Sequence, residues 1–178
     1  MPLVLCPGAA MADVSTAESG LVDQDLVEIV HEVWDAYLQQ PDAPEVDTPT
    51  VQDAKTITAA VSITGAWEGH VRVLAPPSVA ADITAIMLAM DKAEVTDQDV
   101  TDAMGELINV VGGNIKNRGA QPAKLGLPVV ATGKMLFPAT KETHRLALRW
   151  PEGDPITFSV LQVNPDRAVI PAATARPR

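Results

Sequence analysis

The segment from residue 97 to residue 117 constrains the fold most, because it predicts a long helix with two different sides. Thr96 is a good N-cap, and Asp99 three positions later resembles the end of a capping box. With 3.6 residues per turn, one side is an apolar stripe: Met104, Leu107, Ile108, Val111 and Ile115. The opposite side is a narrow stripe of other chemistry: Asp102, Glu106, Asn109, Gly113 and Lys116. Such a helix packs on a sheet and presents a carboxylate, a carboxamide and bare backbone outward.

The residues before this helix predict a helix, a hairpin and a second helix. Apolar residues recur at helical spacing from Val22, and this first helix should end before Pro41, with a loop over residues 41–50. Two strands then predict a hairpin, and proline opens the next helix. These three elements are Thr56–Thr64, Gly69–Leu74 and about Ser78–Met90.

The residues after the central helix predict only strands, separated by breaks rich in proline and glycine. The three predicted strands are Pro128–Phe137, Thr143–Trp150 and Ile156–Val163. The order of all these elements predicts a single α+β domain, in which an antiparallel sheet packs against long helices.

The length of 178 residues fits roughly one domain, which we expect to span residues 21–163. Residues 1–20 show no period, and residues 164–178 contain three prolines and little pattern. We therefore expect a disordered N-terminal arm and a flexible C-terminal tail in these two stretches. No stretch approaches the ~18 apolar residues of a membrane span, and the N-terminus is a poor signal peptide.

Composition excludes several kinds of chemistry. The single cysteine, Cys6, excludes an intramolecular disulfide and a cysteine-based zinc site, and it is typical of a reduced, cytoplasmic protein. A formal net charge of −10 and only 3% aromatic residues argue against a nucleic-acid partner. His31, His70 and His144 lie far apart in the sequence, so we expect no metal site.

The outward stripe admits two interpretations. Glu106 and Asn109 lie three positions apart and so are neighbours on one face; they are either a solvated surface or a pair that binds a cation and orients a water molecule. Gly112 and Gly113 each cost about 1 kcal/mol in a helix relative to alanine. Either the helix ends there and the glycines form its C-cap, or Gly113 lets a partner approach closely.

The longer segment DAMGELINVVGGNIKNRG resembles the signature of the CheX-type chemotaxis phosphatases, within the wider CheC/CheX/FliY group. The matching residues are Asp102, Glu106, Asn109, Gly113 and Asn114. The preceding hairpin and helix, with the Trp67-x-Gly69 element, are also similar to that family. The resemblance covers residues 22–163 and is strongest over 65–118. CheC-like members carry two Glu-x-x-Asn helices, whereas this sequence contains one, as CheX-type members do.

The resemblance implies an aspartyl-phosphate phosphatase that acts on the CheY-like receiver domain of a response regulator, in chemotaxis or another two-component pathway. It implies that Asn109 orients the attacking water and that Glu106 pairs with a lysine of the receiver. Gly113 would admit the receiver, and Asp102 and Lys116 would contribute contacts at the rim. The receiver would hold Mg²⁺, so this chain needs no cofactor of its own. The resemblance also implies a homodimer formed through residues 127–137.

Two alternatives remain beside this interpretation. The chain could be a non-catalytic module that binds receivers or dimerises, although such a module would not need the carboxamide of Asn109. The helix could also match the signature by chance within an unrelated α+β domain.

Overall fold

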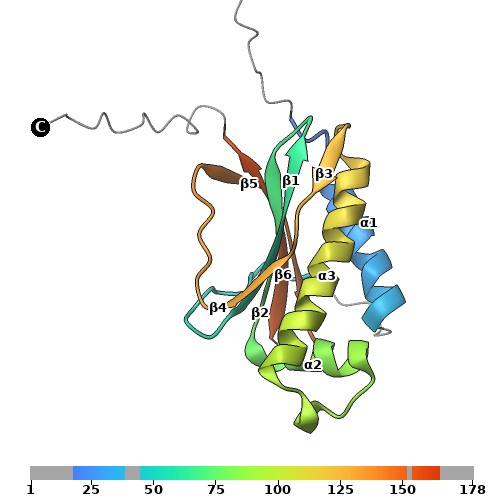
Figure 1. The fold of residues 1–178 in the computed structure, drawn as a ribbon, viewed down its shortest axis with the longest axis vertical. Helices are drawn as coiled ribbons and strands as arrows, with labels where there is room; N and C mark the ends of the chain where they lie inside the picture. Colours follow the sequence, from blue (N-terminus) through green and yellow to red (C-terminus); the bar gives the residue numbers. More distant parts are fainter. Residues whose placement is uncertain (1–17, 39–44, 152–153, 165–178) are drawn as a thin grey trace, which may run out of the picture.

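Three α-helices and one sheet make up the described part of this computed structural model, which comprises residues 18–38, 45–151 and 154–164. The helices are α1 (Asp23–Val33), α2 (Pro77–Leu88) and α3 (Asp97–Arg118). Figure 1 shows α1 and α3 on one side of the sheet and α2 at its lower end. This arrangement confirms the predicted α+β fold with an antiparallel sheet.

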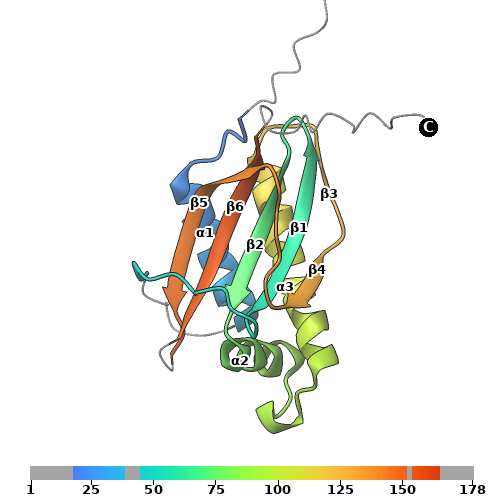
Figure 2. The ribbon, with the colours of Figure 1, turned by 90° about the vertical axis from the view of Figure 1, so that its left-hand side faces the viewer.

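The six strands of the described residues all pair antiparallel. They are β1 (Ile57–Gly65), β2 (Gly69–Ala75), β3 (Ala123–Leu125), β4 (Val129–Thr132), β5 (Thr140–Arg149) and β6 (Pro155–Val163). Their order is β3-β1-β2-β6-β5, and β4 pairs with the start of β1 while β3 pairs with its end. Strands β3 and β4 therefore share one edge of the sheet, seen in Figure 2, and both contact α3.

The strands match the sequence prediction in part. The hairpin is confirmed, with Val61 of β1 opposite Val71 of β2. The strand expected over 128–137 is wrong in its second half, because β4 ends at Thr132 and Gly133 turns the chain with a φ of 96°. Phe137 then lies against His70, with ring centroids 4.8 Å apart. Strand β3 was not predicted, because three residues are too few to show a period.

The first helix starts where predicted but does not stay α-helical. Its α-helical part, α1, ends at Val33, and the next residues, Trp34–Leu38, form a π-helical turn. This wider turn carries Trp34 and Leu38 into the core, where each is 1% exposed. The ring of Trp34 meets that of Trp150 edge-on, with centroids 5.3 Å apart. Packing of these large side chains accompanies the departure from α-helical spacing.

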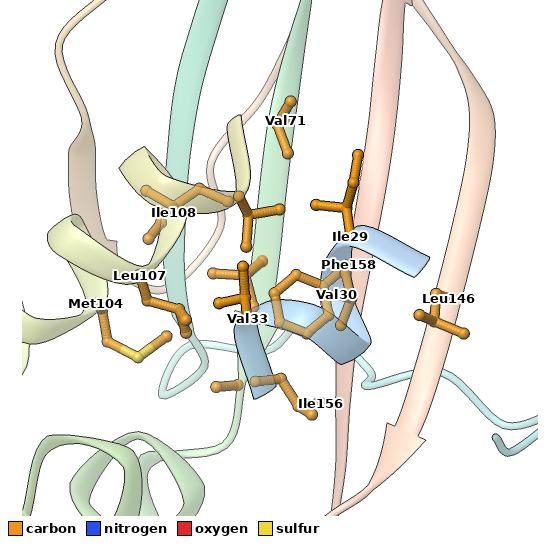
Figure 3. Packing of buried hydrophobic residues seen from close by; sticks show 14 of the residues in the cluster. Ile29, Val30, Val33, Val71, Met104, Leu107, Ile108, Leu146, Ile156 and Phe158 are labelled. Carbon is orange, nitrogen blue, oxygen red and sulfur yellow. The ribbon is translucent and has the colours of Figure 1, made fainter. Parts of the chain in front are cut away.

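The core lies between the sheet and the helices (Figure 3), and α3 supplies one wall of it. The five residues of the predicted apolar stripe are each at most 1% exposed: Met104, Leu107, Ile108, Val111 and Ile115. Opposite them lie side chains such as Val71 of β2 and Phe158 of β6. Burial of this stripe fixes the outward side of α3, because a helix cannot turn without exposing it.

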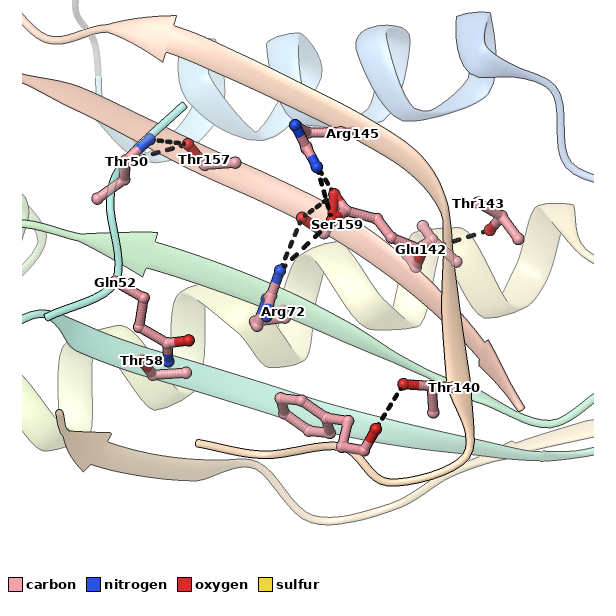
Figure 4. Close-up of polar contacts among 12 residues, drawn as sticks. Thr50, Gln52, Thr58, Arg72, Thr140, Glu142, Thr143, Arg145, Thr157 and Ser159 are labelled. Atoms are coloured by element: carbon pink, nitrogen blue, oxygen red, sulfur yellow. Dashed lines mark hydrogen bonds and ion pairs between the residues drawn. The ribbon is translucent and has the colours of Figure 1, made fainter. Parts of the chain in front are cut away.

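A polar cluster joins three strands on the face of the sheet away from α3 (Figure 4). Glu142 of β5 accepts hydrogen bonds from Arg145, at 2.6 and 3.0 Å, and from the Ser159 hydroxyl of β6 at 3.1 Å. Arg72 of β2 lies 3.7 Å from the same carboxylate. Burial alone would raise the pKa of Glu142, but the hydrogen bond and charge of Arg145 bring that pKa below its ordinary value.

The expected N-terminal arm and C-terminal tail fall largely outside the described residues, which begin at residue 18 and end at residue 164. Among the residues that the structure does describe, no helix is both long enough and apolar enough to cross a membrane.

Candidate functional site

The central helix α3 is fixed at both ends. At its start, Thr96 and Asp99 form the predicted capping box: the Asp99 amide donates to the Thr96 hydroxyl at 3.3 Å, and the Thr96 amide donates to the Asp99 carboxylate at 2.9 Å. Hydrogen bonds from the Thr96 hydroxyl and amide hold the pKa of Asp99 below its ordinary value. At its end, Arg118 donates to Asp25 at 3.0 Å and to Glu28 at 2.7 Å, both on α1.

The predicted outward stripe lies on the accessible side of α3. Asp102 and Glu106 are exposed, while Asn109, Gly113 and Lys116 are partly exposed. Because consecutive members are three or four positions apart, they form one line along the helix. The structure therefore brings the five predicted site residues together on one continuous surface.

The side chains of Glu106 and Asn109 have no hydrogen-bond or ion-pair partner among residues 18–38, 45–151 and 154–164. Their neighbours differ: the Asp102 carboxylate accepts a hydrogen bond from Gln98 at 2.9 Å, and Asn114 donates to the Val110 carbonyl at 3.2 Å. Asn114, though part of the signature, thus satisfies its amide inside the helix. The Glu106 carboxylate and the Asn109 carboxamide are instead free to bind groups from outside.

The two glycines of α3 have different surroundings. The interpretation of Gly112 and Gly113 as a C-cap is wrong, because the helix continues to Arg118 and Gly119 is the C-cap. A Cβ on Gly112 would overlap the Val61 side chain of β1, so this glycine lets helix and sheet approach closely. A Cβ on Gly113 would find only Leu125 nearby, at 4.0 Å. The packing inside the chain therefore does not require a glycine at position 113.

Leu125 is a neighbour of the site that the sequence did not indicate. It lies on β3, opposite Ile63 of β1, and its side chain is partly buried against α3. Only the unexplained pair of glycines signalled that another segment packs at this level of the helix. Its position follows from the sheet, because β3 pairs with the last residues of β1.

Among the residues that the structure describes, no group of three or more His, Cys, Asp or Glu side chains is placed to hold a metal ion. A carboxylate beside a carboxamide can still do two things: Glu106 can accept a hydrogen bond from a cationic group, and Asn109 can orient a water molecule with its amide. Both require a partner that supplies the reacting group.

Comparison with known proteins matches a family profile described as "Chemotaxis phosphatase CheX" over residues 57–148. No curated protein matches the sequence. Among solved structures, the chemotaxis protein CheX from Vibrio vulnificus is similar with a TM-score of 0.62 at 15% identity, covering 82% of this chain and 97% of that one.

Two further solved structures are similar to this chain. The CheX of the CheX–CheY–BeF₃–Mg²⁺ complex from Borrelia burgdorferi has a TM-score of 0.62 at 14% identity, covering 79% of this chain and 97% of that one. The CheX of Desulfovibrio desulfuricans has a TM-score of 0.59 at 18% identity, covering 78% and 97%. At these identities the structural neighbours establish the fold, and the family profile establishes membership.

Proposed function

We propose, from the premise that the chain belongs to the CheX family of chemotaxis phosphatases, that it hydrolyses the aspartyl phosphate of a response-regulator receiver domain. The observation that carries this proposal is the pair Glu106 and Asn109, which lies on the accessible stripe of α3 without a partner among the described residues. The solved CheX–CheY complex of the family supports a CheY-like receiver as the partner.

The chemistry is in-line attack of water on phosphorus, which is mainly a problem of positioning and charge stabilisation. The Asn109 carboxamide would orient the attacking water within the receiver's active site. The bond from phosphorus to the aspartyl oxygen breaks, releasing inorganic phosphate and the free carboxylate. No side chain of this chain is proposed as a general base, because proton transfer is left to water and the carboxylates of the receiver.

Docking is assigned to the remaining residues of the stripe. Glu106 would accept a hydrogen bond from a lysine of the receiver and so fix its orientation. Gly113 would let the receiver approach the helix backbone, and Asp102 and Lys116 would contact it at the rim. The receiver would bind Mg²⁺ with its own carboxylates; that the solved complex of the family contains CheY and Mg²⁺ supports this assignment. Because the proposed partner is a response regulator, we propose that the protein acts in the cytoplasm.

The experiment combines the protein with a CheY-type receiver domain from the same genome, phosphorylated in the presence of Mg²⁺. Phosphate release should exceed the autodephosphorylation of the receiver alone and stop when Mg²⁺ is chelated. Binding of the phosphorylated receiver without faster release would support the second candidate, a non-catalytic receiver-binding module of the same fold. Neither binding nor release across the receivers of that genome would contradict both candidates.

A homodimer is a separate part of the proposal. Three large apolar side chains are exposed in β4 and in the segments on either side of it: Leu127 at 86%, Val129 at 57% and Leu136 at 73%. An apolar surface beside an uncovered strand edge favours pairing with a second copy. Sedimentation should give a dimer mass for wild type and a monomer mass for Leu136→Glu. A monomeric wild type would contradict this part alone.

A further inference from the structure

The missing side chain of Gly113 leaves a space, called the notch below, one turn from Asn109 on the outward side of α3. Its floor is Gly113, one turn further along the helix, and its wall is the side chain of Leu125 on β3. Leu125 Cδ2 lies 4.0 Å from the position that a Cβ of Gly113 would occupy. No other atom approaches that position within 4 Å, apart from the chain neighbours of Gly113 and its own helix turn. The notch is therefore open to a group from outside.

The wall of the notch is held firmly by the fold. Leu125 pairs with Ile63 across β1 and β3, and its Cδ1 lies 3.4 Å from the Cβ position of Gly112. The buried glycine thus lets Leu125 lie close over the helix, and the other methyl of Leu125, Cδ2, lies beside the space over Gly113. The result is an apolar surface directly beside a polar stripe of carboxylate and carboxamide.

A receiver that uses Asn109 must also cover this notch. An amide that orients the attacking water lies within about 3 Å of it, and Gly113 lies only about 6 Å further along the helix axis. Whatever part of the receiver lies over Gly113 consequently contacts Leu125. Against the Leu125 side chain, a polar group would lose water without gaining a partner, whereas an apolar group would gain from burial.

We propose that Leu125 is a specificity-determining residue, which selects receivers carrying an apolar side chain that packs over Gly113 beside the phosphorylated aspartate. This inference rests on the proposed phosphatase function and adds to it the chemistry of the partner surface. Receivers with a charged side chain at that place would be poor substrates, because Leu125 offers no hydrogen bond to it.

The test compares Leu125→Ala with Leu21→Ala, a matched control because Leu21 is also partly buried against the core but precedes α1, away from the notch. Using a CheY-type receiver of the same genome, Leu125→Ala should raise KM about five- to tenfold. Leu125→Met, which preserves volume and apolar character, should restore KM to within about twofold. The control should leave KM at the wild-type value.

A second measurement separates this inference from the phosphatase function. The dissociation constant is determined for the same receiver held with beryllium fluoride and Mg²⁺, so that binding is measured without hydrolysis. If wild type binds but does not hydrolyse, the enzyme proposal fails and the role of Leu125 is still decided by the affinity of Leu125→Ala. Equal affinities for Leu125→Ala and Leu21→Ala would overturn the inference, and so would the absence of any binding by wild type.

Discussion

The two sides of α3 differ in their contacts, although they belong to one helix. Inward, the side chains are buried in the core: Leu107 is 1% exposed, and a Cβ on Gly112 would overlap Val61. Outward, Glu106 and Asn109 have no partner among the described residues, and the Cβ position of Gly113 has only the Leu125 side chain nearby, at 4.0 Å. The inward residues can be explained without any other molecule. For the outward residues we propose a partner molecule, because folding of the described residues alone does not explain a glycine in the middle of a helix.

The adjacent glycines show this difference most clearly. Gly112 is explained by close approach of α3 to β1, which any side chain would prevent. Gly113 costs helix stability, and no close packing among the residues that the structure describes requires a glycine there. Substitutions on the inward side should therefore damage folding first, and substitutions on the outward side should damage activity first.

The largest effect on stability is expected from Leu107→Ala on the inward side. Removing a fully buried leucine should cost about 2–5 kcal/mol of the free energy of unfolding, since the surrounding core can only partly close the cavity. Denaturant unfolding followed by circular dichroism measures this. A loss below about 1 kcal/mol would contradict the assignment of this side to the core.

Substitutions of Gly112 and Gly113 allow a matched comparison of the inward and outward sides of α3. Gly112→Ala should lower the free energy of unfolding by about 1–3 kcal/mol, because its methyl overlaps Val61. Gly113→Ala should raise it by up to about 1 kcal/mol through helix propensity and yet lower kcat/KM for the receiver. Unfolding curves and phosphate release are recorded for both variants. If Gly113→Ala were more stable and fully active, its assignment to the docking surface would be wrong.

The residues of α3 also show which features of the fold and the site the sequence alone can predict. The two sides of α3 were predictable, because a single helical period sorts apolar from polar positions and Thr96 with Asp99 marks the start. The roles of Gly112 and Gly113 were not predictable from the sequence. The two glycines differ because the Val61 side chain packs against Gly112 and not against Gly113, and only the tertiary fold brings Val61 there.

Other features that the sequence does not predict also depend on contacts between distant segments of the chain. The π-helical turn after Val33 accompanies the packing of Trp34 on Trp150, a contact between distant segments. The sequence predicts a strand that includes residues 133–137, but Gly133 turns the chain and Phe137 packs on His70 instead. The sequence does not indicate the position of Leu125, because its strand is defined by pairing with β1 and not by any local pattern.

A moderate effect on activity is expected from Glu106→Gln on the outward side. Loss of the carboxylate charge should weaken the contact with a cationic group of the receiver and raise KM about tenfold or more. The fold should be unaffected, because the Glu106 side chain is exposed. The control is Glu94→Gln, which makes the same change at an exposed position before α3. Equal KM values for the two variants would remove Glu106 from the docking surface.

The smallest effect concerns the capping box and depends on pH. Because the pKa of Asp99 is lowered in the folded protein, its contribution to stability is fully present above the ordinary pKa of about 4 and is lost as the pH falls through the lowered value. The difference in unfolding free energy between wild type and Asp99→Asn should therefore shrink from about pH 6 to about pH 3. A difference that stays constant over this interval would contradict the lowered pKa.

The central claim is that α3 carries the activity on its outward side through the carboxamide of Asn109. The most direct measurement compares phosphate release from a phosphorylated receiver by wild type, Asn109→Ala and Asn114→Ala. The last variant makes the same change on the same helix, at an amide already bonded to the Val110 carbonyl. The account predicts a loss of about 100-fold or more for Asn109→Ala, unchanged folding, and near wild-type release for Asn114→Ala. Full activity of Asn109→Ala, or equal losses in both variants, would contradict it.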